Sequence, residues 1–559
     1  MTNNKLKILM CSEASFLSSG FGTYAKEILS RLHATNKYTV AEFASYGMVN
    51  HPQDSSIDWI YYANAVRSDD PRHKEYNARQ DNQFGRWRFE KVLIDFKPDI
   101  VIDVRDYWMS AYQQFSPLRK FFHWILMPTV DSEPQQEPWL DTYINADAIF
   151  TYSDWGADVL KKQTSNHINY IDTTSPGVDL KTFNIKHNKK EIKNKLGLPE
   201  DSIIIGSVMR NQKRKLIPEL LISFRKLLDD LYESNDPNKD KVYLYLHTSY
   251  PDMGWDIPEL IRHHRVANRV LFTYVCKNCK HIQASTFNGP ARRCSRCLEK
   301  TSMFPSVSTG ISQSELAEIY NCFDLYVQYA ICEGFGMPQV EAGACGVPVI
   351  TVNYSAMCDL VNKIEAMPVN PRSYFTELET KATRVYPDNE QLIKHIKDFI
   401  KLSEKEKTKK KEHTRLLTEK YYNWDDVAKK WESYLDTLDN NGYRANWHTA
   451  PANMEDIGPI NFDTINPSQY FDVMVNICQK SLRNIDEIGA YHMLDMLCHA
   501  DYGFVLQGMN PQKVDNIGNL IEYVNTFIKN NNLSDHVRHN NIPIEEDFIS
   551  YAKIKNETK

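Results

Sequence analysis

The 559-residue chain lacks long hydrophobic runs and an excess of one charge. No segment approaches the roughly 18 apolar residues of a membrane-spanning helix, and the apolar stretch within MTNNKLKILMC is too short for a signal peptide. The 66 Lys and Arg residues stand against 72 Asp and Glu residues, so the net charge of −6 gives no overall field for nucleic acid or an anionic membrane. These absences favour a globular cytoplasmic protein with material for two or three cores.

Cysteine does not follow the pattern of a disulfide scaffold. The chain has 11 cysteines, an odd number, which fits a reducing cytoplasm. Four of them form two C-x2-C motifs, Cys276 with Cys279 and Cys294 with Cys297. Four thiolates fill the tetrahedral coordination sphere of a Zn²⁺ ion and leave no position open for water or substrate. This spacing therefore predicts a structural zinc ribbon over residues 275–309. Redox dithiols or unliganded thiols are the alternative.

The predicted ribbon is locally basic. Its charge provides a contact surface for a polyanionic acceptor or a partner, or else is solvated surface charge on a small module. We expect neither of the main sheets to depend on this insertion. The basic residues are Lys277, Lys280, His281, Arg292, Arg293 and Arg296.

The segment 331–350, ICEGFGMPQVEAGACGVPVI, indicates a strand–loop–helix–strand unit. Residues 323–328 are apolar like a buried strand, a glycine-rich turn follows, and residues 338–345 form a short helix. Gly346 ends that helix, and residues 347–352 form the next strand. In a parallel sheet this places the helix N-terminus at the carboxyl edge, where its free N–H groups favour an anion such as phosphate.

Two carboxylates flank this turn. Glu333 lies in the loop and Glu341 about one turn into the helix, so both can face one site. Carboxylates repel phosphate, which indicates that they bind hydroxyl groups instead. A nucleotide sugar offers both diphosphate and hydroxyls. The alternative is an ordinary turn with two solvated glutamates.

Two cations follow an earlier strand, residues 203–210, and precede a helical pattern over residues 216–228. Arg210 and Lys215 lie five positions apart there. A guanidinium group matches two phosphate oxygens and a lysine adds a movable charge. A solvated basic helix start is the alternative, but cations are unfavourable at helix N-termini unless an anion compensates.

Together these segments resemble the retaining glycosyltransferases of the GT-B fold, the "group 1" type. The resemblance covers roughly residues 5–437. It implies that Glu333 contacts the donor sugar, Glu341 holds the ribose, and Arg210 and Lys215 bind the diphosphate. It also implies that the turn at the helix start lies against the donor phosphates, through Gly334, Phe335, Gly336 and Met337.

In the first half of the chain the resemblance rests on fewer residues. Residues 7–11 are expected to form a strand and residues 24–32 a helix, with Gly20 and Gly22 in the turn between them. The resemblance places this turn against the donor phosphates and the acceptor, whereas a purely structural turn is the alternative. Relatives often carry a histidine where this chain has Asp131, which is either a sugar ligand or a helix cap.

The implied architecture is α/β, with two Rossmann-like domains facing a cleft. We expect an acceptor-side domain at 1–178, a nucleotide-sugar domain at 179–422, and the ribbon 275–309 inserted at the rim of the donor site. A crossover helix at 423–438 returns to the first domain. Residues 443–559 show helical apolar spacing and form an extension for packing, acceptor binding or oligomerisation.

The implied activity is metal-independent, retaining transfer from a nucleotide-diphosphate sugar. UDP is the expected nucleotide, with GDP or ADP as alternatives, and no protein base is nominated. The acceptor is a saccharide, a lipid-linked sugar, a protein or a modified base in DNA. A non-enzymatic nucleotide-binding scaffold is the alternative from another class, but the presence of both glutamates and both cations argues against it.

Overall fold

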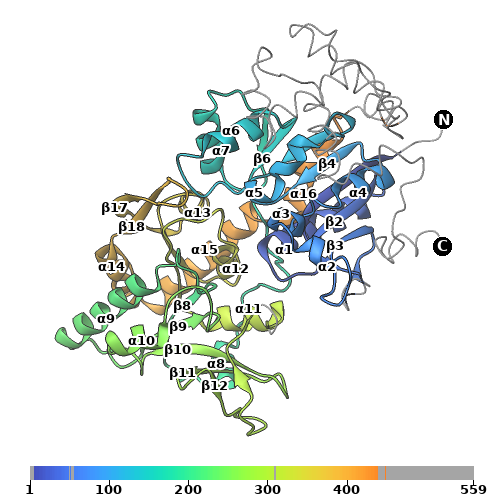
Figure 1. Cartoon of the computed structure of the whole chain (residues 1–559). Helices are drawn as coiled ribbons and strands as arrows, with labels where there is room; N and C mark the ends of the chain where they lie inside the picture. Colours follow the sequence, from blue (N-terminus) through green and yellow to red (C-terminus); the bar gives the residue numbers. More distant parts are fainter. Residues whose placement is uncertain are drawn as a thin grey trace, which may run out of the picture.

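The structure, a computed structural model, describes residues 5–49, 51, 56–116, 118–306, 310–438 and 447. It contains two large β-sheets with helices on their faces, one over residues 6–173 and one over residues 203–369 (Figure 1). The predicted α/β class is confirmed: the first sheet is parallel, and the second is parallel except where the ribbon strands pair antiparallel. None of the described helices is long and apolar enough to cross a membrane.

The first domain is built on a fully parallel sheet with the order β3-β2-β1-β4-β5-β6-β7. Its strands are β1 (Leu6–Glu13), β2 (Tyr38–Met48), β3 (Ile60–Ala65), β4 (Ile100–Asp103), β5 (His123–Leu126), β6 (Ala148–Thr151) and β7 (Tyr170–Thr173). The helices are α1 (Gly20–Ala34), α2 (His73–Tyr76), α3 (Gln80–Gln83), α4 (Phe89–Phe96), α5 (Tyr107–Ser110), α6 (Glu137–Ile144) and α7 (Asp154–Gln163), with short 3-10 turns at Ala111–Phe115 and Arg119–Phe121.

The second domain has a nine-stranded sheet with the order β12-β13-β10-β9-β8-β14-β15-β16, and β11 also pairs with β10. Its strands are β8 (Ile203–Val208), β9 (Val242–His247), β10 (Val270–Cys276), β11 (Ile282–Thr286), β12 (Ala291–Arg292), β13 (Ser302–Met303), β14 (Leu325–Gln328), β15 (Val349–Val352) and β16 (Met367–Val369). A separate hairpin joins β17 (Pro371–Thr376) to β18 (Thr383–Pro387).

Helices cover this second sheet and then return to the first domain. They are α8 (Lys189–Leu196), α9 (Ile217–Glu233), α10 (Ile257–His263), α11 (Gln313–Cys322), α12 (Met337–Ala344), α13 (Met357–Ile364), α14 (Asn389–Ile400), α15 (Glu404–Tyr421) and α16 (Trp424–Leu435). Strands such as β14 are buried on both faces, which is why they appear in the sequence as continuous apolar runs.

The ribbon strands join the second sheet, although we expected neither main sheet to depend on this insertion. Strand β11 pairs antiparallel with β10 from Leu271↔Thr286 to Val275↔Ile282. Ile282 and Ala284 are buried in the main hydrophobic core. The ribbon therefore covers the edge of β10, which would otherwise present unpaired backbone groups.

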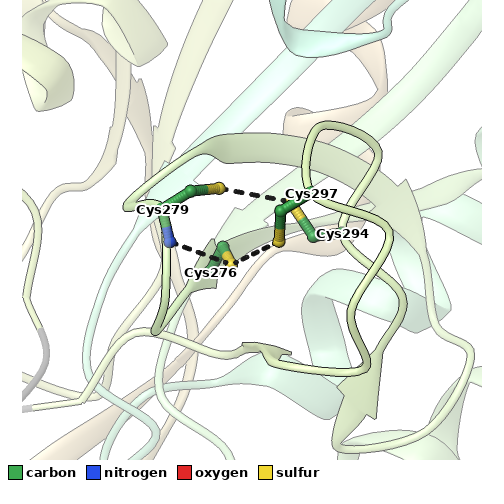
Figure 2. Close-up of side chains that lie close together, drawn as sticks. All are labelled: Cys276, Cys279, Cys294 and Cys297. Carbon is green, nitrogen blue, oxygen red and sulfur yellow. Dashed lines mark hydrogen bonds between the residues drawn. The ribbon is translucent and has the colours of Figure 1, made fainter.

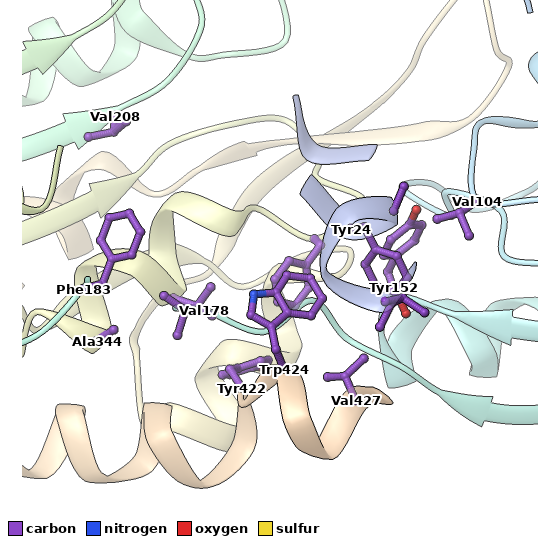
Figure 3. Close-up of a cluster of buried hydrophobic side chains, with 14 of the residues drawn as sticks. Tyr24, Val104, Tyr152, Val178, Phe183, Val208, Ala344, Tyr422, Trp424 and Val427 are labelled. Atoms are coloured by element: carbon purple, nitrogen blue, oxygen red, sulfur yellow. The ribbon is translucent and has the colours of Figure 1, made fainter. Parts of the chain in front are cut away.

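Helix α16 packs against α1 of the first domain, so that one hydrophobic core spans both domains (Figure 3). The Trp431 ring stacks on Phe150 at 4.1 Å between centroids, and its Nε1 donates to the Tyr24 hydroxyl at 2.8 Å. A Cβ at Gly177 would lie 2.5 Å from the backbone nitrogen of Trp424, so only glycine permits this close approach.

Beyond residue 438 the structure describes one residue, Trp447. The Trp447 ring contacts Phe121 at 5.0 Å, and its Nε1 donates to the Pro98 carbonyl at 2.8 Å. The rest of the predicted extension 443–559 lies outside the described residues.

Candidate functional site

Two positions in the turn after β14 require glycine, one because of its backbone conformation and the other because a residue of the first domain lies very close. Gly336, the residue before α12, has a φ of +93°, in the left-handed region that favours glycine. A Cβ at Gly334 would lie 2.3 Å from Cγ2 of Thr129 in the first domain. The two domains therefore approach each other closely at this turn. Phe335 is buried, with its ring 5.6 Å from Tyr422, and so contributes to packing.

Glu333 is buried among cations on this turn. Its carboxylate accepts from Arg214 Nη1 at 2.6 Å, from Lys215 Nζ, and from Gln328 Nε2 at 2.6 Å. Burial favours the neutral acid, but the charges of Arg214 and Lys215 prevail and lower the pKa of Glu333 to about 2. Burial and the neighbouring Arg214 lower the pKa of Lys215 to about 8. Glu333 is thus a carboxylate at neutral pH.

Glu341 lies in the middle of α12. Its Oε2 accepts from the Tyr320 hydroxyl at 2.7 Å, and burial raises its pKa to about 7. Burial raises the pKa of Tyr326, and the charges of both glutamates raise it further. The Tyr326 hydroxyl lies 2.6 Å from Gln328 Oε1, and Gln328 in turn donates to Glu333. The predicted pair is therefore brought to one region, with Tyr326 close to both carboxylates.

Arg210 follows β8, but its side chain binds Asp252 and not the Glu333 carboxylate. Its guanidinium forms two hydrogen bonds with Asp252, at 2.9 and 3.1 Å, and the side chain is 48% exposed. Within the part of the chain that the structure describes, Arg210 makes no hydrogen bond or ion pair with Lys215 or Glu333. The predicted pair of cations is thus separated: Lys215 faces the glutamate and Arg210 lies at the surface.

Arg214 is a site residue that the sequence did not single out. It contacts both Glu333 and, at 3.3 Å, the carbonyl of Cys332. In the sequence, Arg214 stands out only as part of the basic run Lys213-Arg214-Lys215. The five-residue spacing predicts Arg210 and Lys215 as the phosphate-binding residues and does not include Arg214.

Asp131 lies in the loop after β5, where the two domains meet. Its Oδ1 accepts from Arg384 Nη1 of β18 at 3.2 Å, and Cys332 Sγ lies 3.4 Å from its Oδ2. The alternative of a helix cap is wrong, because α6, the next helix, begins at Glu137 after Gln136. Asp131 instead links the first domain to the loop that carries Glu333.

Gly20 and Gly22 are placed differently from the prediction. Helix α1 begins at Gly20, not at residue 24, and Ser19 caps it by accepting from Gly22 N at 3.1 Å. A Cβ at Gly22 would lie 2.6 Å from the Ala14 carbonyl oxygen, so this glycine serves loop packing. A Cβ at Gly20 would lie 3.9 Å from Met337 Sδ, which places the N-termini of α1 and α12 opposite each other.

The four predicted cysteines form one cluster (Figure 2). Their sulfurs all lie within 4.8 Å of one another, with Cys276 and Cys297 3.5 Å apart and Cys279 and Cys294 3.6 Å apart. Sulfurs that bind one Zn²⁺ tetrahedrally at about 2.3 Å are about 3.8 Å apart, so the cluster fits a metal ion of that size. Backbone N–H groups of Cys279 and Arg296 donate to Cys276 Sγ and Cys294 Sγ, which supports the thiolate form.

The six basic residues of the ribbon differ in their contacts and in their exposure. Arg292 stacks over the Tyr274 ring at 5.3 Å, and the His281 ring lies 3.0 Å from the Ser295 hydroxyl. The other four are exposed: Lys277, Lys280, Arg293 and Arg296.

Comparison with known proteins relates this site to a family. Residues 306–415, which include the turn and α12, match the family described as "Glycosyl transferases group 1". The chain is 24% identical over 216 residues to D-inositol 3-phosphate glycosyltransferase 2 of Catenulispora acidiphila, covering 39% of this chain and 42% of that protein. It is 26% identical over 238 residues to D-inositol 3-phosphate glycosyltransferase of Streptomyces bingchenggensis, covering 42% and 44%. The chain thus spans less than half the length of these curated relatives.

Solved structures extend the likeness over both domains. Sucrose-phosphate synthase from Thermosynechococcus elongatus superposes with a TM-score of 0.55 at 18% identity, covering 78% of this chain and 99% of that one. HepE of Anabaena in complex with UDP-glucose superposes with a TM-score of 0.53 at 12% identity, covering 78% and 100%. The chain therefore has the GT-B fold, and its residues 306–415 resemble the group 1 family of glycosyltransferases.

Proposed function

We propose that this protein transfers a sugar from a UDP-sugar to an acceptor hydroxyl with retention of the anomeric configuration. The observation that carries the proposal is the buried carboxylate of Glu333, held anionic by Arg214 and Lys215 in the loop that precedes α12. Such a carboxylate accepts hydrogen bonds from sugar hydroxyls, and the adjacent cations and helix N-terminus compensate the diphosphate.

Each remaining residue has a role in this proposal. The Arg210 side chain is 48% exposed in its ion pair with Asp252, so it can exchange Asp252 for a diphosphate oxygen. Lys215 supplies a second cation next to the sugar. Glu341 accepts hydrogen bonds from the ribose, and UDP is chosen because the similar HepE structure contains UDP-glucose.

In the reaction, the bond between the anomeric carbon and the diphosphate oxygen breaks, and the acceptor oxygen bonds to the same face of that carbon. The acceptor proton passes to a donor phosphate oxygen. Negative charge grows on the leaving diphosphate, so cations that are already in place stabilise the transition state more than the bound donor.

The cysteine cluster is proposed to hold zinc as a structural ion. Its four sulfurs would supply all the ligands, so the residues around it serve to fold the ribbon and to cover β10, and no step of the transfer passes through it.

Slow donor hydrolysis without acceptor tests the proposal. The purified chain is incubated with UDP-, GDP- and ADP-sugars, nucleotide release is followed, and NMR records the anomer released first. We expect hydrolysis of at least one UDP-sugar with the configuration retained. The proposal is abandoned if no nucleotide sugar is hydrolysed and no nucleoside diphosphate binds.

A further inference from the structure

Three aromatic side chains lie together on the surface of the first domain. The Tyr107 ring is stacked on Trp139 with centroids 5.3 Å apart, and the Trp108 ring meets the edge of Trp139 at 6.2 Å. Trp108 is 52% exposed. We call Tyr107, Trp108 and Trp139 the aromatic platform. An exposed indole next to two further rings offers a flat apolar surface on which a ligand can stack.

Two carboxylates accompany the aromatic platform. Asp106 directly precedes α5, follows β4, and makes no side-chain cap bond to that helix. Asp131 follows β5, which pairs with β4, so the two acids stand at the carboxyl edge of adjacent strands. Burial raises the pKa of Asp106 to about 6, and the charge of Asp131 adds to this effect. The two carboxylates therefore lie near each other at the edge where parallel sheets bind ligands.

A buried hydroxyl group lacks a partner at the same place. The Tyr143 side chain is 1% exposed, and its hydroxyl has no hydrogen-bond partner within the described part of the chain. The Tyr143 ring meets the Tyr107 ring edge-on at 6.2 Å. Burial raises the pKa of Tyr143, and the charges of Asp106 and Asp131 raise it further. Native proteins rarely leave such a buried hydroxyl unpaired.

The platform is connected to the donor side through Arg214. The charge of Asp106 and that of Asp131 both interact with Arg214, which is hydrogen-bonded to Glu333. The Cys332 sulfur, one residue before Glu333, is 3.4 Å from Asp131. A ligand between the platform and Asp131 would therefore lie next to the sugar that Glu333 is proposed to bind.

We propose that the aromatic platform, Asp106, Asp131 and Tyr143 form the acceptor site and that the acceptor is a saccharide. One face of a pyranose ring presents C–H groups, which carry partial positive charge and match the negative face of an indole. Its hydroxyls donate to carboxylates and accept from the tyrosine hydroxyl. A phosphate-rich acceptor such as DNA would be repelled by the two acids.

The inference rests on the proposed function for its chemistry. The acceptor is the hydroxyl component: its oxygen forms the new bond to the anomeric carbon, the diphosphate leaves, and the proton leaves with it. Because sugar binding by the platform needs no donor, binding and transfer can be measured separately.

Saturation-transfer NMR tests the binding step with the full chain. The probes are maltose, cellobiose, methyl α-mannoside, glucosamine and N-acetylglucosamine at millimolar concentration. We expect at least one to bind, and Trp108→Ala and Asp106→Asn to weaken that binding about tenfold, since each removes one contact worth about that factor. Tyr421→Ala is the matched control, because Tyr421 is an exposed aromatic residue, 42% accessible, at the end of α15.

The same saccharides are then offered as acceptors with the nucleotide sugar that is hydrolysed. The expected result is a product saccharide, with the ratio of transfer to hydrolysis about tenfold lower in Trp108→Ala than in Tyr421→Ala. Hydrolysis without any saccharide binding, or equal binding by Trp108→Ala and the parent chain, overturns the saccharide site and leaves the proposed function intact. Saccharide binding without nucleotide binding or hydrolysis overturns the proposed function and leaves the saccharide site intact.

Discussion

Asp131 and Arg384 join the two domains through a hydrogen-bonded ion pair, Oδ1 to Nη1 at 3.2 Å, at the point where the Glu333 loop meets the first domain. Arg384 also binds the Asp131 carbonyl and the Glu377 carboxylate. The pair therefore joins the loop after β5 of the first domain to strand β18 of the second.

We first predict that Asp131 and Arg384 are energetically coupled. In a double-mutant cycle with Asp131→Asn and Arg384→Gln, a coupling energy on the order of 1 kcal/mol is expected in unfolding experiments, because the side chains share a partly buried bond. Turnover should fall in both single variants. Additive effects on both stability and turnover would mean that the contact does not hold the site together.

The second prediction separates the two cations. Arg210→Ala should lower turnover about a hundredfold and change stability less than Lys215→Ala does, because the Arg210 side chain is 48% exposed whereas that of Lys215 is buried. Lys215→Ala should lower turnover similarly and also destabilise the fold by about 3 kcal/mol, since it leaves a buried carboxylate with fewer partners. Thermal unfolding and initial rates check both. Near-normal turnover in a folded variant would remove that residue from the site.

Third, we predict different roles for the two glutamates. Glu341→Ala should weaken binding of UDP itself, because this residue is proposed to hold the ribose. Glu333→Gln, which keeps the side-chain volume, should spare UDP and weaken binding of the UDP-sugar. Calorimetry with both ligands on both variants is the measurement. Equal losses for the two ligands in both variants would contradict this division of roles.

A pH dependence follows from Glu341. Its pKa is about 7 in the folded protein against 4.5 ordinarily, so the folded state holds a proton that the unfolded state releases. This contribution to stability is present below pH 4.5 and is lost as the pH rises to 7. UDP affinity should move in the opposite direction and increase through pH 7, as the carboxylate forms. Glu341→Gln should flatten both profiles between pH 5 and 8, and persistence of either slope would assign it to another group.

The periodicity of the sequence predicts the strands and helices that carry the site to within a few residues, because buried parallel strands are continuous apolar runs. Strand 203–210 ends in the structure at Val208, and the strand expected from residue 323 begins at Leu325, because Phe323 caps α11. The start of α1 was misplaced, because Ser19 caps a first turn that contains two glycines, and glycine in a sequence indicates a loop.

Contacts between domains could not be predicted in the same way. Nothing local to Asp131 points to Arg384, which lies 253 residues later. Arg214 was passed over because its partner, Glu333, is distant in sequence, and whether Lys215 faces a phosphate or a carboxylate depends on the same packing. Pairing of β11 with β10 likewise depends on which edge of the sheet is free.

The last prediction concerns the metal. The chain should contain one zinc ion bound by Cys276, Cys279, Cys294 and Cys297, and Cys279→Ser should lose it, because metal binding and folding of such a site are coupled. Cys358→Ser is the control, since Cys358 is a free, partly buried cysteine outside the cluster. Less than about half an equivalent of zinc in reduced protein grown with zinc would overturn the assignment.

Loss of zinc should affect more than the ribbon. Strand β11 pairs with β10. The aromatic ring of Phe304, which belongs to the ribbon, lies 5.9 Å from the ring of Tyr250, and Tyr250 is two residues before Asp252, the partner of Arg210. We therefore expect Cys279→Ser to lower the unfolding temperature of the second domain and to weaken donor binding through Arg210, whereas Cys358→Ser changes neither. Calorimetric unfolding and UDP titration test this. A zinc-free variant with unchanged unfolding and donor affinity would show that the ribbon supports neither the sheet nor the site, despite its pairing with β10.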